Sequence, residues 1–416
     1  MMMPPIKILS IAAGSRGTGY ASYAEKHPDR VQIVGVAEPR DFYRQQMVGN
    51  YDIPMANTFT DWREAVARDK FADAVIIATQ DAMHTEPAIA FAEKGYHILL
   101  EKPMAPTEEE CIRIAEAAKR NHVILAVCHV MRYTQYTQRL KKVVESGVIG
   151  DVVNLQHLEP VGYWHQAHSF VRGNWRNEAA SSFMLLAKSC HDLDWIRHMM
   201  GVSCRSLSSF GSLKHFRKEE QPEGASDRCL DCGVEAECSY SAKKIYLGRL
   251  AKGQTGWPIN VLTPDVTEES VMDALRNGPY GRCVYVCDND VVDNQVVNML
   301  FEGGRTASFT MTAFNEAGHR KTHIFGTKGA LYGDGTKITR FDFLTDETEV
   351  IDTSAADASI LGGHGGGDYG IMHSFVEAVS TGDPSKVLSG ADESLETHRM
   401  VFAAERARKE HCVVDL

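Results

Sequence analysis

The stretch Glu101-Lys102-Pro103 contains a lysine that could exchange a proton with an alcohol. The apolar run 96–100 before it is typical of a buried strand. A residue at the end of such a strand projects into the crevice where parallel sheets bind their ligands. Partial burial beside a bound cation lowers the pKa of a lysine toward the range that suits proton transfer. The alternative is an ordinary surface turn.

A second candidate is the run KSCHDLD at 188–194, within a helix predicted over about 182–200. Lys188, His191 and Asp194 are spaced i, i+3 and i+6, so in a continuous helix they share one face. His191 could accept a hydroxyl proton as hydride leaves the same carbon, with Asp192 or Asp194 orienting its ring. The alternative is a solvated helix face with a hydrogen-bonded histidine.

Both stretches depend on the N-terminal run IKILSIAAGSRGTG, which predicts a strand, a glycine turn and a helix. Gly14 lets the backbone approach a pyrophosphate, and Gly17 lets the helix pack closely on the strand. The amide groups at the start of the helix then face the phosphates. Ala12 stands where the usual G-x-G-x-x-G pattern has its first glycine. The alternative is an ordinary strand-helix-strand unit.

An acidic residue ends the next predicted strand. Glu38 follows the apolar run 31–37 and can accept hydrogen bonds from both ribose hydroxyls of an adenosine, which favours NAD. A carboxylate at this place also repels the 2′-phosphate of NADP. Arg40 lies two residues further on and could accept that phosphate, so NADP remains an alternative.

The rest of the chain predicts two different sheets. Strands and helices alternate up to about residue 130, which indicates a doubly wound parallel sheet. Thr79-Gln80 and Cys128-His129 end further strands of that sheet. Strand-like alternation then predicts a large, mostly antiparallel open sheet. We therefore expect an α/β protein with a dinucleotide-binding domain at 1–131 and a substrate-binding and oligomerisation domain at 132–416, with a charged, turn-rich insertion at about 213–280.

The bulk composition narrows the class of protein. The chain has 416 residues, 44% of them hydrophobic, and a formal net charge of −11. A net negative charge argues against nucleic acid and anionic membranes as partners. No apolar run approaches the roughly 20 residues that span a bilayer, and the first apolar run is used by the strand and turn rather than by a signal segment. We expect a cytoplasmic protein with mostly reduced cysteines.

Three cysteines in the insertion have metal-ligand spacing. Cys229, Cys232 and Cys238 could bind a structural zinc ion, which needs a fourth ligand. The candidates for that ligand are Cys204, Cys283, Cys287 and His215. Such a site would stabilise an insertion that is expected to have little core of its own. The alternatives are an iron–sulfur site or unrelated reduced thiols.

Together these features resemble the Gfo/Idh/MocA oxidoreductase family over nearly the whole chain. The resemblance rests on the IAAGSRG turn, Glu38, the EKP at 101–103, the HVMRY at 129–133 and the KSCHDLD at 188–194. It implies a Rossmann domain, a C-terminal α/β domain, a bound NAD(P), and a sugar, cyclitol or polyol substrate, with Lys102 and His191 as catalytic residues. We predict cofactor contacts from Ala13, Gly14, Ser15, Arg16, Gly17, Glu38, Arg40, Thr79, Gln80, His84, Glu101 and Lys102.

One departure affects the substrate side. Dehydrogenases of the family commonly have an aspartate four residues before the histidine, where this chain has Ala187. We predict that Lys188 or Asp192 substitutes for it. Aromatic and polar walls for a sugar ring are predicted from Tyr163, Trp164, His165 and Trp175, of which Trp175 could instead belong to the core.

Two other functions fit the same residues. The missing carboxylate is compatible with a glycosidase that uses NAD transiently, oxidising a ring carbon and reducing it again. A non-catalytic sensor that keeps the fold would bind the cofactor without turnover. The open face of the second sheet predicts a homodimer or homotetramer in each case.

Overall fold

The computed structural model describes residues 4–353 and 364–416. Its first sheet has six parallel strands in the order β3-β2-β1-β4-β5-β6, which confirms the doubly wound prediction. The strands of this sheet are β1 Ile6–Ile11, β2 Val31–Ala37, β3 Thr58–Phe59, β4 Ala74–Ile77, β5 His97–Leu100 and β6 Leu125–Val127. The chain order reverses at β1, so a crevice opens beyond the carboxyl ends of β1 and β4.

The second sheet has nine strands in the order β14-β13-β12-β11-β7-β10-β9-β8-β15. All neighbouring strands are antiparallel except β7 and β10, so the prediction of a mostly antiparallel sheet is confirmed. These strands are β7 Val152–Pro160, β8 Cys204–Ser212, β9 Asn294–Phe301, β10 Thr306–Thr312, β11 Lys321–Gly326, β12 Gly329–Gly333, β13 Lys337–Asp342, β14 Glu347–Asp352 and β15 Val413–Asp415.

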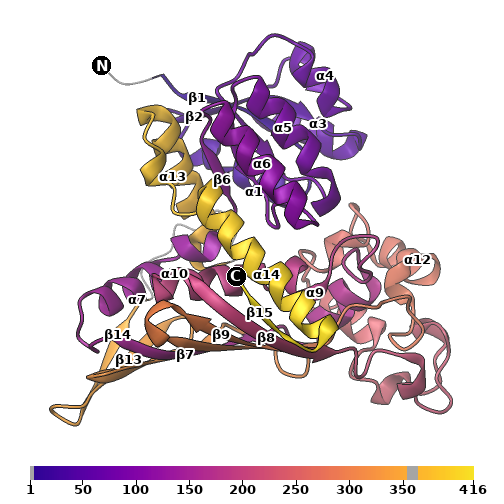
Figure 1. Cartoon of the computed structure of the whole chain (residues 1–416). Coiled ribbons are helices and arrows are strands. Elements are labelled where there is room, and N and C mark those ends of the chain that lie inside the picture. The colour runs from indigo at the N-terminus through magenta and orange to yellow at the C-terminus, as the bar shows by residue number, and fades with distance from the viewer. Residues whose placement is uncertain (1–3, 354–363) are drawn as a thin grey trace.

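Helices cover both faces of the first sheet and one face of the second (Figure 1). The helices up to residue 120 are α1 Ser15–Ala21, α2 Tyr23–Lys26, α3 Asp41–Tyr51, α4 Trp62–Val66, α5 Thr85–Glu93 and α6 Glu108–Arg120. The later ones are α7 Gln135–Glu145, α8 Tyr163–His165, α9 Met184–Ala187, α10 Cys190–Met200, α11 Gly248–Leu250, α12 Glu268–Asn277, α13 Gly367–Thr381 and α14 Ala391–Glu410.

The C-terminal helices join the two sheets. Helix α13 lies beside β1 and β2 in Figure 1, and its Ile371 and Phe375 belong to the core of the first sheet. Helix α14 then runs from the first sheet to the second (Figure 1). Because α13 packs on the first sheet, that core includes residues from both predicted domains, and the boundary at 131/132 stays a prediction.

The insertion between β8 and β9 forms a lobe with a hydrophobic cluster. Its core includes Phe216, Tyr246, Ile259 and Leu275, all at most 1% exposed. The prediction that this segment has little core of its own is therefore wrong, because apolar residues scattered among charged turns converge in space. No helix in the described part of the chain is long and apolar enough to cross a membrane.

Candidate active site between the two sheets

The glycine turn after β1 has the conformation that a pyrophosphate site needs. Ala12 has a φ of 76°, in the left-handed region that usually favours glycine. A Cβ atom on Gly17 would lie 2.2 Å from the Ala12 carbonyl oxygen, so only glycine allows α1 this close to the turn. Gly14 caps α1 with no side-chain hydrogen bond to the first amide groups of the helix. The residues present therefore fit a pyrophosphate at this turn.

Glu38 at the end of β2 is nearly inaccessible and tied to the turn. Its carboxylate accepts hydrogen bonds from the Ala13 amide at 2.9 Å and from the Arg40 side chain at 2.8 Å. Burial raises the pKa of Glu38, but these hydrogen bonds outweigh it and hold the pKa below its usual value. Glu38 is therefore ionised at neutral pH and occupies the guanidinium of Arg40 in this structure.

A cavity of about 290 Å³ lies between the carboxyl edge of the first sheet and the second domain; we call it the interdomain cavity. Arg16, Thr79, Glu101 and Lys102 line it from the first sheet. Its remaining walls include His165, Ser169, Phe170, Trp175, Ala187, Lys188, His191, Trp257 and Arg320. The two candidate stretches of the sequence, around residues 102 and 191, thus meet in one cavity.

Lys102 is held at the boundary between the two parts of the molecule. Its Nζ donates a hydrogen bond to the Ala187 carbonyl oxygen at 2.8 Å. The helix predicted over 182–200 is broken here, since α9 ends at Ala187 and α10 begins at Cys190. At this break the Ala187 carbonyl faces the cavity. Ala187 has no side-chain carboxylate, and it binds Lys102 through its backbone oxygen instead.

Glu101 anchors the turn that carries Lys102. It is 6% exposed and accepts hydrogen bonds from Arg16 and from the Tyr20 hydroxyl. Burial raises its pKa, but the charges of Arg16 and Lys102 lower it more, so Glu101 is a carboxylate. Arg16 also pairs with Asp368 of α13 at 2.6 Å. These ion pairs tie helix α1, strand end β5 and helix α13 together beneath the cavity.

Because the helix is broken, Lys188, His191 and Asp194 do not all face the same side, as a continuous helix would require. Lys188 and His191 line the interdomain cavity, but Asp194 is fully buried and accepts two hydrogen bonds from Arg132, both at 2.7 Å. Asp192 is fully buried as well and does not line the cavity. Buried cations thus hold both carboxylates away from this cavity, and a contact of Asp192 with the substrate stays a prediction.

Asp192 belongs to a network of four charged side chains. The Lys188 Nζ lies 2.9 Å from a Glu159 oxygen, and the Arg320 Nε lies 2.6 Å from the other Glu159 oxygen and 2.8 Å from Asp192. Burial raises the pKa of Asp192, but the charge of Arg320 together with His157 lowers it by more. Two cations that line the cavity, Lys188 and Arg320, thus balance two carboxylates behind them, and we call these four residues the ion-pair cluster.

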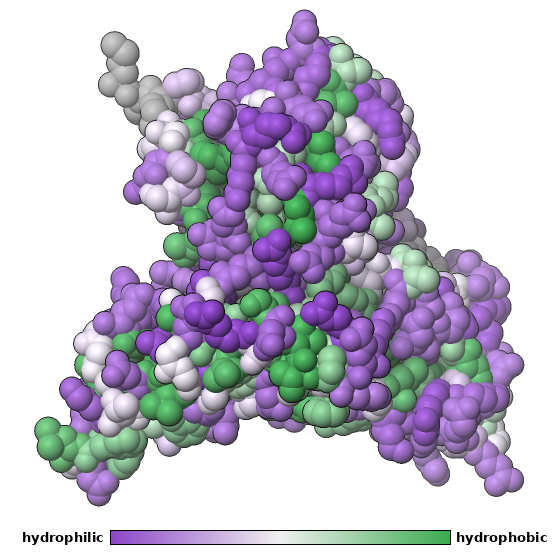
Figure 2. All heavy atoms as spheres, viewed as in Figure 1, coloured by the Kyte–Doolittle hydropathy of each residue, from purple (hydrophilic) through white to green (hydrophobic). Residues whose placement is uncertain are grey.

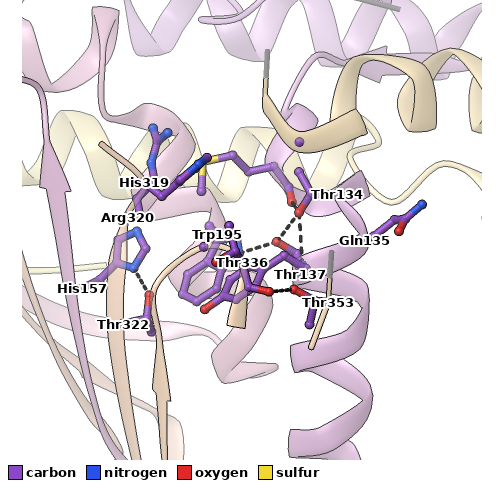
Figure 3. Close-up of a pocket in the computed structure, with 14 residues that line it drawn as sticks. Thr134, Gln135, Thr137, His157, Trp195, His319, Arg320, Thr322, Thr336 and Thr353 are labelled. Atoms are coloured by element: carbon purple, nitrogen blue, oxygen red, sulfur yellow. Dashed lines mark hydrogen bonds between the residues drawn. The ribbon is translucent and has the colours of Figure 1, made fainter. Parts of the chain in front are cut away.

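Arg320 also lines a second cavity, of about 260 Å³, together with His157 (Figure 3). Several polar groups of this cavity bind one another. Thr137 accepts a hydrogen bond from the Trp195 indole at 2.9 Å, and His157 pairs with Thr322 at 2.7 Å. Figure 3 shows these contacts as dashed lines, and they position His157 against Asp192.

The predicted aromatic walls divide between two places. His165 and Trp175 line the interdomain cavity, and burial lowers the pKa of His165 well below its usual value. Tyr163 instead lines a separate hollow beside Tyr240, and Trp164 packs beneath the Arg249 guanidinium at 3.9 Å. Tyr163 and Trp164 thus face the insertion and do not line the interdomain cavity, and their role as substrate walls stays a prediction.

The other predicted cofactor residues lie along the same sheet edge. Ser15 begins α1, and Gln80 is exposed just after β4. His84 is fully buried, with its ring nitrogens 2.8 Å from the Pro103 carbonyl and 3.2 Å from the Thr79 carbonyl. In this structure His84 thus fixes the loops around Thr79 and Lys102 rather than facing the cavity.

Several residues in and around the cavity were not predicted, among them Glu159, Arg320 and Trp257. Glu159 is the penultimate residue of β7, Arg320 directly precedes β11, and Trp257 lies in the insertion. Charged residues at the ends of predicted strands are a signal that could have found Glu159 and Arg320. Trp257 carries no such signal, because its segment has no periodic pattern.

The cysteine prediction is not supported. Cys229, Cys232 and Cys238 line one cavity together with Cys283. No group of three or more histidine, cysteine, aspartate or glutamate side chains within 4–353 and 364–416 is arranged to hold a metal ion. The Cys229 thiol instead lies 3.5 Å from Arg172 and 3.8 Å from the Arg282 carbonyl oxygen. The hydrophobic cluster of the insertion supplies the stabilisation that a zinc ion was expected to give.

Curated relatives match parts of the chain. A levoglucosan dehydrogenase from Pseudarthrobacter phenanthrenivorans is 31% identical over 41% of this chain and 47% of its own length. A 2,7-anhydro-N-acetylneuraminate hydratase from Escherichia coli is 29% identical over 36% of this chain and 40% of its own length. The chain thus spans less than half the length of each of these two relatives.

A solved structure and two family models cover the chain more fully. A levoglucosan dehydrogenase in complex with NADH and levoglucosan has the same fold, with a TM-score of 0.72, 19% identity and 99% of each chain covered. The family model described as "Oxidoreductase family, NAD-binding Rossmann fold" matches residues 6–129. The model described as "Oxidoreductase family, C-terminal alpha/beta domain" matches residues 141–416. The chain therefore belongs to the Gfo/Idh/MocA family of NAD(P)-dependent oxidoreductases.

Proposed function

We propose that this dehydrogenase transfers hydride between NAD and a secondary hydroxyl carbon of a sugar, cyclitol or related polyol. The observation that carries the proposal is the meeting of Lys102 and His191 in one cavity at the carboxyl edge of the dinucleotide-binding sheet. Curated relatives include levoglucosan and inositol dehydrogenases, which supports a ring polyol as the substrate class.

The residues present support NAD over NADP. The Gly14–Gly17 turn would hold the pyrophosphate, and Glu38 would hold the adenosine ribose. Glu38 is ionised and already binds Arg40, so a 2′-phosphate would meet a carboxylate and compete for its cation. When bound, NAD supplies the hydride acceptor, and the protein supplies orientation and electrostatics.

The proton is handled by the two residues at the cavity floor. The Lys102 ammonium, positioned by the Ala187 carbonyl, donates a hydrogen bond to the substrate oxygen and stabilises negative charge on it as the C–H bond breaks. His191 accepts the hydroxyl proton and returns it in the reverse direction. Lys188, anchored on Glu159, binds a neighbouring hydroxyl.

The test measures net oxidation directly. Dialysed protein is assayed with NAD and with NADP against myo-inositol, scyllo-inositol, levoglucosan and D-glucose, reading absorbance at 340 nm. We expect a rise with NAD and at least one ring polyol, and a loss of about 10²–10⁴-fold in kcat for Lys102→Ala and His191→Ala. NADH binding by both variants, followed by fluorescence, separates this from loss of the cofactor site.

A second function is favoured by one observation. Ala187 offers the cavity a carbonyl instead of the usual carboxylate, and the relatives include two hydratases by name. A redox-neutral reaction, such as glycoside cleavage through transient ring oxidation, is the second candidate. Nitrophenyl glycosides in the same assay decide between the two. Nitrophenol release that requires NAD without net NADH would replace the dehydrogenase proposal.

We also propose a cytoplasmic homodimer or homotetramer that does not bind nucleic acid. Its ten cysteines are free thiols, as in reducing compartments. The hairpin of β13 and β14 projects from the body and ends in a hydrophobic tip (Figure 2), where Phe343 is 53% and Leu344 93% exposed. Such a tip is typical of an interface. Light scattering on the purified protein gives the subunit number; a monomer would contradict the assembly.

A further inference from the structure

Among the described residues of the insertion, Trp257 is the one that lines the interdomain cavity. It lies 48% exposed in the segment between α11 and α12, although tryptophan usually buries most of its surface. The side chain is thus a large apolar surface turned toward a cavity whose other walls carry Lys102, Lys188 and His191.

Three aromatic rings hold Trp257 in place. His165 meets it edge to face at 5.0 Å and 80°, and His168 meets it at 5.4 Å and 90°. Trp164 lies 5.2 Å away in a tilted contact. Aromatic pairs in these geometries stabilise each other beyond their buried area. The indole is therefore positioned before any ligand arrives.

These supporting rings are themselves anchored in the lobe. His168 stacks on Tyr280 at 4.9 Å, and its Nδ1 lies 2.9 Å from the Tyr246 hydroxyl. Burial lowers the pKa of His168 to about 3, so the ring is neutral at physiological pH and adds no charge beside the indole. The core of the insertion thus contacts the Trp257 wall of the cavity through His168.

We propose that Trp257 is a specificity-determining residue that gives the C–H face of a ring-shaped polyol an apolar platform. A sugar or cyclitol ring has polar hydroxyls around its rim and less polar C–H groups on its faces. The cavity provides both complements, with polar donors on Lys102 and Lys188 and an exposed indole on Trp257. A linear polyol presents no rigid face, so the platform selects for rings. This inference rests on the proposed function.

Because the platform touches parts of the substrate that do not react, it binds ground state and transition state alike. Trp257→Ala is therefore expected to raise KM for ring polyols roughly tenfold or more, because the substrate ring loses the apolar area that it buries against the indole. We expect kcat to change less than about threefold. Trp257→Phe keeps an aromatic face and is expected to restore most of the affinity.

The experiment measures binding as well as turnover. Myo-inositol, levoglucosan and the linear polyol sorbitol are titrated by calorimetry into protein saturated with NADH. The variants are Trp257→Ala, Trp257→Phe and Val261→Ala, a matched control in the same loop that is 44% exposed and does not line the cavity. We expect weaker ring binding only in Trp257→Ala, with unchanged NADH affinity and unchanged sorbitol affinity.

The outcomes separate the two proposals. Ring affinity that stays within about twofold in Trp257→Ala overturns the platform, even where turnover establishes the dehydrogenase. If ring binding depends on Trp257 but no polyol yields NADH, the platform is supported and the dehydrogenase proposal is overturned. Absence of ring binding by the wild-type protein overturns the platform. If Trp257→Ala unfolds, Trp257→Leu takes its place, because leucine keeps apolar bulk but offers no flat aromatic face; ring affinity within about twofold of the wild type would then overturn the platform.

Discussion

The two walls of the interdomain cavity are built by different rules. On the first sheet, Thr79 and Lys102 lie just past the ends of β4 and β5, and Arg16 lies in the first turn of α1, after the glycine turn that ends β1. Their positions are therefore set by local strand, turn and helix geometry. On the opposite wall, Lys188 is held by Glu159 and by a helix break, and Trp257 is held by three rings from another segment. The cofactor wall is thus local in sequence, whereas the substrate wall is assembled from distant parts.

This difference has an energetic consequence. A wall set by backbone turns keeps its shape when one side chain is changed, except at a glycine such as Gly17. A wall set by buried ion pairs depends on every member, because removing one charge leaves its partner desolvated. We therefore expect single substitutions on the substrate wall to disturb structure as well as binding. The following predictions, from the largest effect to the smallest, test this contrast.

The largest effect is expected at Asp194, which joins α10 to the segment after β6 through Arg132. Asp194→Asn removes the charge of a fully buried pair with two 2.7 Å hydrogen bonds. Because Arg132 is then buried without its carboxylate, we expect the free energy of unfolding to fall by about 3–5 kcal/mol. Urea unfolding followed by circular dichroism measures the loss.

A matched pair nearer the surface provides the control. Arg197 and Glu396 have the same two-bond geometry, both at 2.8 Å, with side chains 21% and 33% exposed. Water stabilises the remaining partner there, so Glu396→Gln should cost about 1 kcal/mol or less. Equal losses in the two variants would contradict the claim that burial makes the Arg132–Asp194 pair critical.

The next effect concerns the ion-pair cluster. Lys188→Met removes one of two cations from Glu159, which is 2% exposed, and leaves Arg320 shared between two carboxylates. We expect a loss of about 1–2 kcal/mol in unfolding free energy and roughly tenfold weaker polyol binding, with NADH affinity unchanged.

The double variant Lys188→Met/Glu159→Gln removes both partners and should recover most of the stability but not the polyol affinity. A double-mutant cycle from urea unfolding measures this coupling. Additive stability losses would mean that Lys188 and Glu159 act independently, and the cluster would then not be a unit. Reduced NADH affinity in Lys188→Met would contradict the claim that the substrate wall and the cofactor wall are built independently.

The same contrast explains what the sequence could predict. Both sheets, the glycine turn and Glu38 follow from strand ends and spacing, which are local signals. The pairing of Lys102 with His191 was expected from the resemblance to the family. The break at Ala187 was missed, because the continuous helical spacing of 182–200 gives no signal for it and the partner of its carbonyl, Lys102, lies 85 residues away. The position of Tyr163 and Trp164 outside the interdomain cavity could not be predicted, because both side chains pack against the insertion, whose core has no sequence period.

A smaller effect is expected in the dependence of stability on pH. His129 is fully buried, with its ring 6.0 Å from that of His191, and faces Asp194, His398, Arg132 and Lys102. Burial lowers its pKa to about 3, against an unfolded value of about 6.5. Between these values the unfolded state binds the proton and the folded state remains neutral at this ring. Stability therefore rises with pH, and it is lost as the pH falls below about 6.5.

His129→Asn removes this one proton, so between pH 4 and 6 the slope of unfolding free energy against pH should fall by about 1.4 kcal/mol per unit. Urea unfolding at several pH values gives the slope. His122→Asn is the control, because His122 is exposed and has a φ of 53°, which asparagine tolerates. An unchanged slope in His129→Asn would mean that His129 is protonated in the folded protein.

The smallest effect is expected on the cofactor wall, at Arg40. Its side chain is 54% exposed and binds Glu38, so water replaces the lost ion pair when it is removed. Arg40→Ala should change kcat/KM for NAD by about threefold or less, since exposed pairs contribute little. Arg63→Ala, at an arginine 67% exposed in α4, controls for the loss of surface charge. A selective fall of more than about tenfold in kcat/KM for NADP would instead make Arg40 a 2′-phosphate ligand. In that case Arg40 would leave Glu38 when NADP binds. The cofactor wall would then change its side-chain contacts on binding, although its backbone is set by local turns.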